Sequence, residues 1–172
     1  MNGYGGAGTL SDGKYNLTTQ FGGELHRYIG TENAMDLMNY VDEVLCKMGG
    51  ADAKLYSTAN SDLKTIALRN NLHLLEAKVR HLGTDRNVKI LEKIYDFTKE
   101  KIDFKFHTCI KSVEVKDSNS FVVKTDSGEE YSCGNLVLAT GRSGSKWIGS
   151  VCDKLGIAQK SNRVDIGVRV EL

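Results

Sequence analysis

Residues 109–132 of this chain, CIKSVEVKDSNSFVVKTDSGEEYS, decide its fold class. Apolar and polar residues alternate within three short segments, at Cys109 to Val115, Phe121 to Thr125 and Glu129 to Ser132. The tetrapeptide DSNS separates the first two segments and the tripeptide DSG the last two, and both are rich in residues that favour tight turns. The stretch therefore predicts three consecutive antiparallel strands, a meander with one exposed face.

The next residues, LVLATGRSGSKW at 136–147, predict a buried strand, a turn of small residues and a helix. The first four are apolar throughout, as expected of a strand that is covered on both faces. The turn from Thr140 to Gly144 offers backbone N–H groups with little steric bulk, and Arg142 adds a positive charge. Ligands of open α/β sheets bind beyond the carboxyl ends of the strands, so this turn is a candidate anion contact. The alternative is an ordinary turn in which Ser143 or Ser145 caps the helix.

Helical spacing of apolar residues predicts four helices. They begin near Thr31, near Ser61, at Thr84 or Asp85, and after Gly141. The first ends at Gly49-Gly50, and the third carries an apolar stripe of Val88, Leu91, Ile94 and Tyr95. Further short strands are expected at 75–80 and at 166–172.

These elements predict a mixed α/β chain in three parts. Residues 1–30 form a glycine-rich cofactor segment, and residues 31–102 form a mainly helical insertion. Residues 103–172 hold the meander, the buried strand and the turn and helix, and run into a truncated further domain. No strand precedes the first glycines and the chain ends within a strand, so both ends look cut.

Composition excludes several classes of function. The chain has 172 residues, with 23 Lys and Arg against 22 Asp and Glu. A net charge of +1 gives no reason to expect a nucleic acid or an anionic membrane as partner. No apolar run approaches the ~20 residues of a membrane span, and no signal peptide is visible. The four cysteines are scattered, which predicts free thiols in a reducing, cytoplasmic location, and no metal site is expected.

Glycine makes up seven of the first 23 residues. Glycine lets the backbone adopt positive φ, or lets a bulky ligand approach the main chain. Gly3, Gly5 and Gly8 match the spacing of the dinucleotide motif GxGxxG. That motif needs a strand before it and a helix after it, whereas Asp12-Gly13 predicts a turn where the helix should run.

A second phosphate motif also matches this segment in part. Gly8, Gly13 and Lys14 fit the P-loop pattern GxxxxGK, but Tyr15 stands where a Ser or Thr hydroxyl would bind magnesium. Two further interpretations are a flexible N-terminal segment and a glycine loop that touches a cofactor in another geometry. The sequence favours the last of these.

Four stretches of the chain resemble one family of flavoproteins. They are GGAGTLSDGKYNLT at 5–18, RHLGTD at 80–85, LVLATGRSG at 136–144 and DIGVRVE at 165–171. In order, and over nearly the whole chain, they resemble the NAD(FAD)-utilising dehydrogenases, which are FAD-dependent oxidoreductases with two dinucleotide-binding domains.

The resemblance implies an internal segment of such an enzyme, with a partial FAD-binding Rossmann-like domain and a helical insertion. The family's GxGxxG fingerprint would lie upstream of Met1, and its later domain beyond Leu172. In the complete protein the flavin would transfer the hydride or electrons, so no catalytic acid or base is expected. FAD is the expected cofactor, NAD(P) is a candidate co-substrate, and the other partner is a small-molecule substrate of unknown identity. The oligomeric state is not fixed by the sequence.

The candidate FAD contacts are Gly5, Gly6, Gly8, Asp12, Gly13, Lys14, Asn16, Ile110, Thr140, Gly141, Arg142 and Ser143. Lys14 and Asn16 are expected near the flavin or its ribityl-phosphate arm, the turn at 140–142 near the diphosphate, and the backbone of Ile110 near the adenine. His81, Thr84 and Asp85 are candidates for facing the substrate, although Thr84 or Asp85 equally predicts a helix cap.

Two functions of other classes remain open. The first is a stand-alone nucleotide- or phosphate-binding module that uses the Gly8–Lys14 loop. The second is a non-catalytic scaffold that binds no cofactor.

Overall fold

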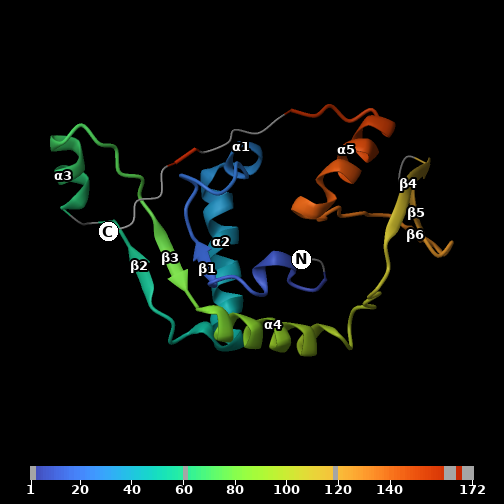
Figure 1. Cartoon of the computed structure of the whole chain (residues 1–172), viewed down its shortest axis with the longest axis horizontal. Helices are drawn as coiled ribbons and strands as arrows, with labels where there is room; N and C mark the ends of the chain where they lie inside the picture. The colour runs from blue at the N-terminus through green and yellow to red at the C-terminus, as the bar shows by residue number, and fades with distance from the viewer. Residues whose placement is uncertain (1–2, 60–61, 118–119, 161–165, 168–172) are drawn as a thin grey trace. The chain divides into compact units, whose positions relative to one another are not determined.

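The computed structural model describes residues 3–59, 62–117, 120–160 and 166–167 (Figure 1). The chain divides into two compact units, Met1–Phe104 and Lys105–Leu172, which are described one at a time. The division falls close to the boundary expected between residues 102 and 103, while the expected parts 1–30 and 31–102 share the first unit. Within the described ranges, none of the helices has both the length and the apolar composition needed to cross a membrane.

The described part of the first unit contains four α-helices, namely α1 (His26–Ile29), α2 (Thr31–Leu45), α3 (Leu63–Arg69) and α4 (Thr84–Thr98). The predicted starts of α2 and α4 are confirmed, but each follows a glycine, Gly30 or Gly83, and neither has a side-chain cap. The π-helical segment η2 (Cys46–Gly50) continues α2 and ends at the glycine pair expected to stop it. Gly49, with φ of 121°, already departs from helical geometry. Ser61, the expected cap of α3, lies outside the described residues.

A three-stranded antiparallel sheet joins distant parts of the first unit. Its strands β1 (Lys14–Asn16), β3 (Lys78–His81) and β2 (Leu55–Ser57) lie side by side in that order (Figure 1). Tyr15 and Tyr56 are both opposite β3 residues, Arg80 and Val79 respectively. The strand expected at 75–80 therefore begins three residues later, and β1 and β2 were not predicted.

The core of the first unit lies where α2, η2 and α4 meet. Leu45, Ala53, Leu82 and Ile90 are buried there, and Tyr15, Met48 and Ile94 pack against them. The expected stripe of α4 is confirmed in part, because Val88, Leu91, Ile94 and Tyr95 are all partly buried and Ile94 packs on the core. The fully buried α4 residues, however, are Asn87 and Ile90.

A buried ion pair fixes the sheet to α2. Arg80 donates to both carboxylate oxygens of Asp42, with Nη2 to Oδ2 at 2.8 Å, and its Nη1 donates to the carbonyl of Ala53 at 2.8 Å. The side chains of Arg80 and Asp42 are only 10% and 14% exposed. The hydrogen bonds to Asp42 raise the pKa of Arg80 above its ordinary value, so the guanidinium stays charged.

The second unit contains the predicted meander. Strands β4 (Ile110–Asp117), β5 (Ser120–Thr125) and β6 (Glu130–Cys133) pair in sequence order, all antiparallel. After them come the 3-10 turn η3 (Arg142–Gly144) and the helix α5 (Ser145–Lys154), which confirms the fourth predicted helix. The indole Nε1 of Trp147 donates to the carbonyl of Lys111 at 3.2 Å and so ties α5 to β4.

The segment at 136–139 differs from its prediction as a buried strand. The described residues there form no strand, and Val137 is 87% exposed. An apolar run becomes a strand only when a neighbouring strand takes up its backbone hydrogen bonds, and none of the described strands pairs with it. The final strand expected at 166–172 lies almost wholly outside the described residues. The mixed α/β class is confirmed, and every described strand pair is antiparallel.

Candidate functional site: the glycine loop and its anchor

Residues 3–16, which we call the glycine loop, fold as a series of tight turns that lead into β1. Gly6 N donates to the carbonyl of Gly3 at 2.9 Å, and the 3-10 turn η1 (Gly6–Gly8) follows. The hydroxyl of Thr9 then donates to the carbonyl of Tyr4 at 2.9 Å, and the hydroxyl of Ser11 to that of Gly8 at 2.9 Å. These local bonds give the loop a defined backbone.

Packing against the protein explains two of the predicted contact glycines. Gly13 has φ of 65°, and a Cβ on it would lie 2.8 Å from the carbonyl oxygen of Gly83. Leu82 N also donates to the carbonyl of Gly13 at 2.8 Å, so the two backbones run in direct contact. At Gly5, a Cβ would lie 2.2 Å from the hydroxyl of Thr9. Neither glycine needs a ligand to account for it.

Asn87 holds the glycine loop on α4, and the sequence did not reveal it. Its side chain is fully buried, its Oδ1 accepts from the hydroxyl of Tyr15 at 2.6 Å, and its Nδ2 donates to the carbonyls of Gly8 and Thr9. Burial also raises the pKa of Tyr15, so its phenol keeps the proton that it donates. The available signal was the position of Asn87 three residues before Ile90, on the face of α4 that enters the core.

Gly8 is different from the other glycines of the loop. Its φ lies outside the left-handed region, and a Cβ on it would meet nothing within 4 Å. Gly8 is exposed, while its carbonyl is bound by Asn87. The protein itself therefore gives no steric reason for glycine at this position, whereas a ligand that approaches the main chain would.

The polar residues predicted at the end of the loop lie at the surface. Lys14 Nζ and Asp12 Oδ2 form an ion pair at 2.6 Å, which lowers the pKa of the Asp12 carboxyl. Asn16, two residues along the strand from Lys14, is also exposed. An amide is thus available to a ligand on one side of β1, next to a lysine whose charge Asp12 compensates.

Neither literal phosphate motif has its required surroundings. A P-loop continues into a helix whose N-terminus holds phosphate, but Lys14 begins the strand β1. The GxGxxG spacing at Gly3, Gly5 and Gly8 is followed by turns, again with no helix. The geometry of the loop therefore favours another mode of contact.

The remaining predicted FAD contacts lie in the second unit. Gly141 has φ of 63°, and Gly144 approaches the side chain of Thr140 so closely that a Cβ would lie 2.4 Å from the Thr140 Cβ. Arg142 and Ser143 are exposed, and no hydrogen bond or ion pair joins their side chains to described residues. Gly144, not Ser143 or Ser145, precedes α5, and no side chain caps this helix.

Ile110 begins β4 opposite Thr125, and it is partly buried. In the first unit, Thr84 and Asp85 open α4 and line a cavity, whereas His81 is exposed at the end of β3. All seven glycine-loop candidates thus lie on one segment of the first unit, and the five others lie in the second.

The cysteine and metal chemistry is simple. Cys46, Cys109, Cys133 and Cys152 are free, as their spacing predicted. The described residues include no group of three His, Cys, Asp or Glu side chains that could hold a metal ion. Comparisons of the chain with models of protein families, with curated proteins and with solved structures find no match.

Proposed function

We propose that the chain is an internal segment of a FAD-dependent oxidoreductase and that its glycine loop contacts FAD. The observation that carries this proposal is Gly8, an exposed glycine that neither its φ nor its neighbours require. The same loop holds most of residues 5–18, one of the four stretches that resemble the NAD(FAD)-utilising dehydrogenases.

The anchoring of the loop supports the proposal, because a cofactor site needs a backbone whose position is fixed before the ligand binds. Asn87 and Tyr15 hold the loop from beneath, and the contact of Gly13 with Gly83 holds its end. The exposed backbone at Gly8 is thus presented on a rigid support.

The residues of this chain would bind and orient the cofactor and leave the redox chemistry to it. FAD supplies hydride or electron transfer at its ring system when it is bound. The backbone at Gly8 would allow close approach, and Asn16 would supply an amide for a hydrogen bond. Lys14 would supply positive charge by exchanging Asp12 for a phosphate of the cofactor. In the second unit, Thr140 to Ser143 offer backbone N–H groups and the charge of Arg142 to the diphosphate.

The finer parts of the proposal follow from the same resemblance. The two units would belong to a Rossmann-like FAD-binding domain with a helical insertion, in a cytoplasmic enzyme that acts on a small molecule. NAD(P) would be its co-substrate. These statements depend on the sequence resemblance to that family, and the observed antiparallel sheets do not support them.

A FAD titration tests the proposal, with flavin fluorescence and melting temperature followed together. The wild-type chain is expected to quench the flavin saturably and to melt at a higher temperature when FAD is present. In Gly8→Ala the added methyl group enters open space in the free protein, so the melting temperature without FAD should not fall. Its affinity for FAD should fall about tenfold, the cost of roughly one methyl clash.

Gly149→Ala, which adds the same methyl group to α5, is the matched control and should leave FAD affinity unchanged. Equal affinities of the wild type and Gly8→Ala would contradict the assignment of the loop. Absence of FAD binding by this chain, and also by a version carrying an upstream βαβ unit, would contradict the flavin assignment itself. Tight binding of ATP that depends on magnesium would instead favour a stand-alone phosphate module.

A further inference from the structure

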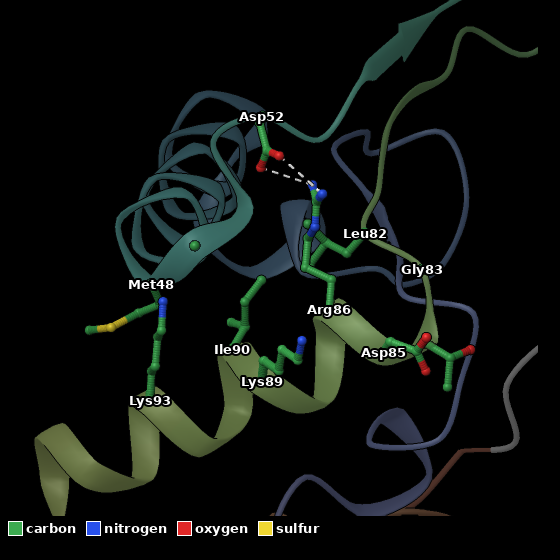
Figure 2. Close-up of a pocket in the computed structure, with 11 residues that line it drawn as sticks. Met48, Asp52, Leu82, Gly83, Asp85, Arg86, Lys89, Ile90 and Lys93 are labelled. Carbon is green, nitrogen blue, oxygen red and sulfur yellow. Dashed lines mark hydrogen bonds and ion pairs between the residues drawn. The ribbon is translucent and has the colours of Figure 1, made fainter.

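A cavity of about 560 Å³ lies in the first unit between α4 and the end of η2 (Figure 2). This volume lies within the range of about 300–1,000 Å³ that is typical of ligand pockets. The cavity is lined by Met48, Gly49, Asp52, Leu82, Gly83, Thr84, Asp85, Arg86, Lys89, Ile90 and Lys93. None of the predicted FAD contacts lines it, whereas Thr84 and Asp85, two of the candidates for facing the substrate, do.

Three cations from one face of α4 reach this cavity. Arg86, Lys89 and Lys93 are spaced at i, i+3 and i+7, which places them in a row along the helix. Figure 2 shows Arg86 and Lys93 extending from α4 toward the α2–η2 side of the cavity, and Asp85 at the opposite end from Lys93.

Arg86 is fixed by a partner, and the two lysines are not. The guanidinium of Arg86 bonds both oxygens of Asp52, with Nη1 to Oδ1 at 2.9 Å and Nη2 to Oδ2 at 3.0 Å. In the part of the chain that the structure describes, neither Lys89 nor Lys93 has an ion-pair or hydrogen-bond partner. The cavity thus holds two uncompensated ammonium groups.

This arrangement costs stability in the empty protein. Like charges at i and i+4 on a helix repel each other, and Lys89 and Lys93 have that spacing. Asp85 and Glu92 are at helical spacing from Lys89 but form no ion pair with it in the described structure. An anion between the two ammonium groups would replace this repulsion with attraction.

The fold also makes room for the charge of Lys93. Its Nζ lies over Gly49, where a Cβ would be only 3.1 Å away. The φ of 121° at Gly49 is what favours glycine there. The floor of the cavity is apolar, because Leu82 and Ile90 belong to the buried core and Met48 packs against them.

We propose that this cavity binds a small organic dianion, with its charged group between Lys89 and Lys93 and its apolar part on Met48, Leu82 and Ile90. Asp52 already neutralises Arg86, so the charges left on the lining are the two ammonium groups and the carboxylate of Asp85. Asp85 lies at the opposite end of the cavity from Lys93, so the anionic group is expected between the two lysines (Figure 2). A phosphate monoester and a dicarboxylate share this chemistry. The site is a candidate for substrate or effector recognition.

Calorimetric titration of the full chain with phenyl phosphate and with phthalate tests the proposal and distinguishes the two head groups. At least one of them is expected to bind with a stoichiometry of one and to bind more weakly as salt increases. Inorganic phosphate should bind more weakly because it lacks the apolar part, and neutral benzyl alcohol should not bind. Lys89→Gln and Lys93→Gln should each weaken binding about tenfold, the loss of one charge-assisted hydrogen bond.

Lys99→Gln removes a charge from the end of the same helix, outside the cavity, and should leave binding unchanged. Lys93→Arg keeps the charge and should retain most of the affinity. Failure of both dianions to bind, or undiminished binding by the Lys89→Gln/Lys93→Gln double variant, would overturn the site. Equal affinity for phenyl phosphate and benzyl alcohol would overturn its anionic character, and displacement of the bound dianion by FAD would overturn its separation from the flavin site.

Discussion

Two glycine-rich turns of this chain look alike in sequence and are held in different ways. The glycine loop at 3–16 is fixed by contacts with residues more than sixty positions away, namely the bonds of Asn87 to Tyr15 and Gly8 and the contact of Gly13 with Gly83. The turn at 140–144 is shaped by a local contact, that of Gly144 with the side chain of Thr140. Two segments of similar composition are therefore held differently, one by long-range contacts and the other by a local contact.

The difference shows what a ligand would have to do at each place. At the glycine loop the backbone is already fixed, so binding costs little conformational entropy. At 140–144 the described side chains of Arg142 and Ser143 have no partner, so a ligand would have to order them. We therefore expect a ligand to lose less conformational entropy at the glycine loop than at residues 140–144.

Removal of the buried ion pair between β3 and α2 is expected to have the largest effect. Arg80→Leu leaves the Asp42 carboxylate buried without its partner, which should lower the free energy of unfolding of the first unit by about 3–5 kcal/mol. Denaturant unfolding followed by hydrogen exchange would show faster exchange in β1 and β3. The β4–β6 meander, which belongs to the other unit, should be protected as in the wild type.

The double variant Arg80→Leu/Asp42→Leu separates the charge from the packing. It should be more stable than Arg80→Leu alone, because replacing both partners of a buried ion pair with apolar groups avoids the uncompensated charge. A double variant as unstable as the sum of the two single changes would contradict a buried, mutually compensated pair.

Loss of Asn87, which holds the glycine loop, and loss of the Trp147 hydrogen bond, which ties α5 to β4, are expected to act in different units. Asn87→Ala leaves the hydroxyl of Tyr15 and the carbonyl of Gly8 without a buried partner and should destabilise the first unit by about 2–3 kcal/mol. Trp147→Phe removes one bond, to the carbonyl of Lys111, and should cost the second unit about 1 kcal/mol. Hydrogen exchange measured by mass spectrometry should rise at 5–16 in the first variant and stay unchanged there in the second. Unchanged exchange of the glycine loop in Asn87→Ala would show that Asn87 does not hold it.

Local signals predicted some of this fold well. The three meander strands lie within about two residues of their predicted limits, because each ends at a turn whose residues are adjacent in sequence. The helices α2 and α4 begin where expected, since apolar spacing and glycines mark them. The long-range strand pairing was not predicted. Strands β1 and β2 have only three residues each and exist because β3 lies between them.

The candidate site shows the same division. The sequence located the glycine loop, yet it could not distinguish Gly13, which the fold requires, from Gly8, which it does not. Asn87 was missed because a polar residue on a helix is usually at the surface, and only the tertiary contact with Tyr15 makes it part of the core. The apolar run at 136–139 gave the opposite error, because it was predicted to be buried and Val137 is exposed. An apolar segment is buried only where another part of the protein covers it.

Alkaline pH should loosen the glycine loop with the smallest effect of the three. The ordinary pKa of tyrosine is 10.0, and burial raises that of Tyr15 in the folded protein. Between these two values the unfolded chain has lost the proton and the folded protein keeps it, so the free energy of unfolding falls as pH rises through this window. Below pH 10 the contribution is fully present. Above the folded pKa the phenolate can no longer donate to Asn87, and the loop should exchange faster while 140–144 does not.

Tyr15→Phe should lose less stability than the wild type as pH rises through this window, because it has no proton to lose at this position. Burial also raises the pKa of Tyr4, so some pH dependence should remain in that variant. Tyr28, which is 84% exposed, provides the control, and Tyr28→Phe should follow the wild-type curve. An alkaline transition that Tyr28→Phe reduces and Tyr15→Phe leaves intact would place the responsible group away from the glycine loop. The contrast between an anchored and a locally held turn would then have to rest on Asn87 and Gly13 alone.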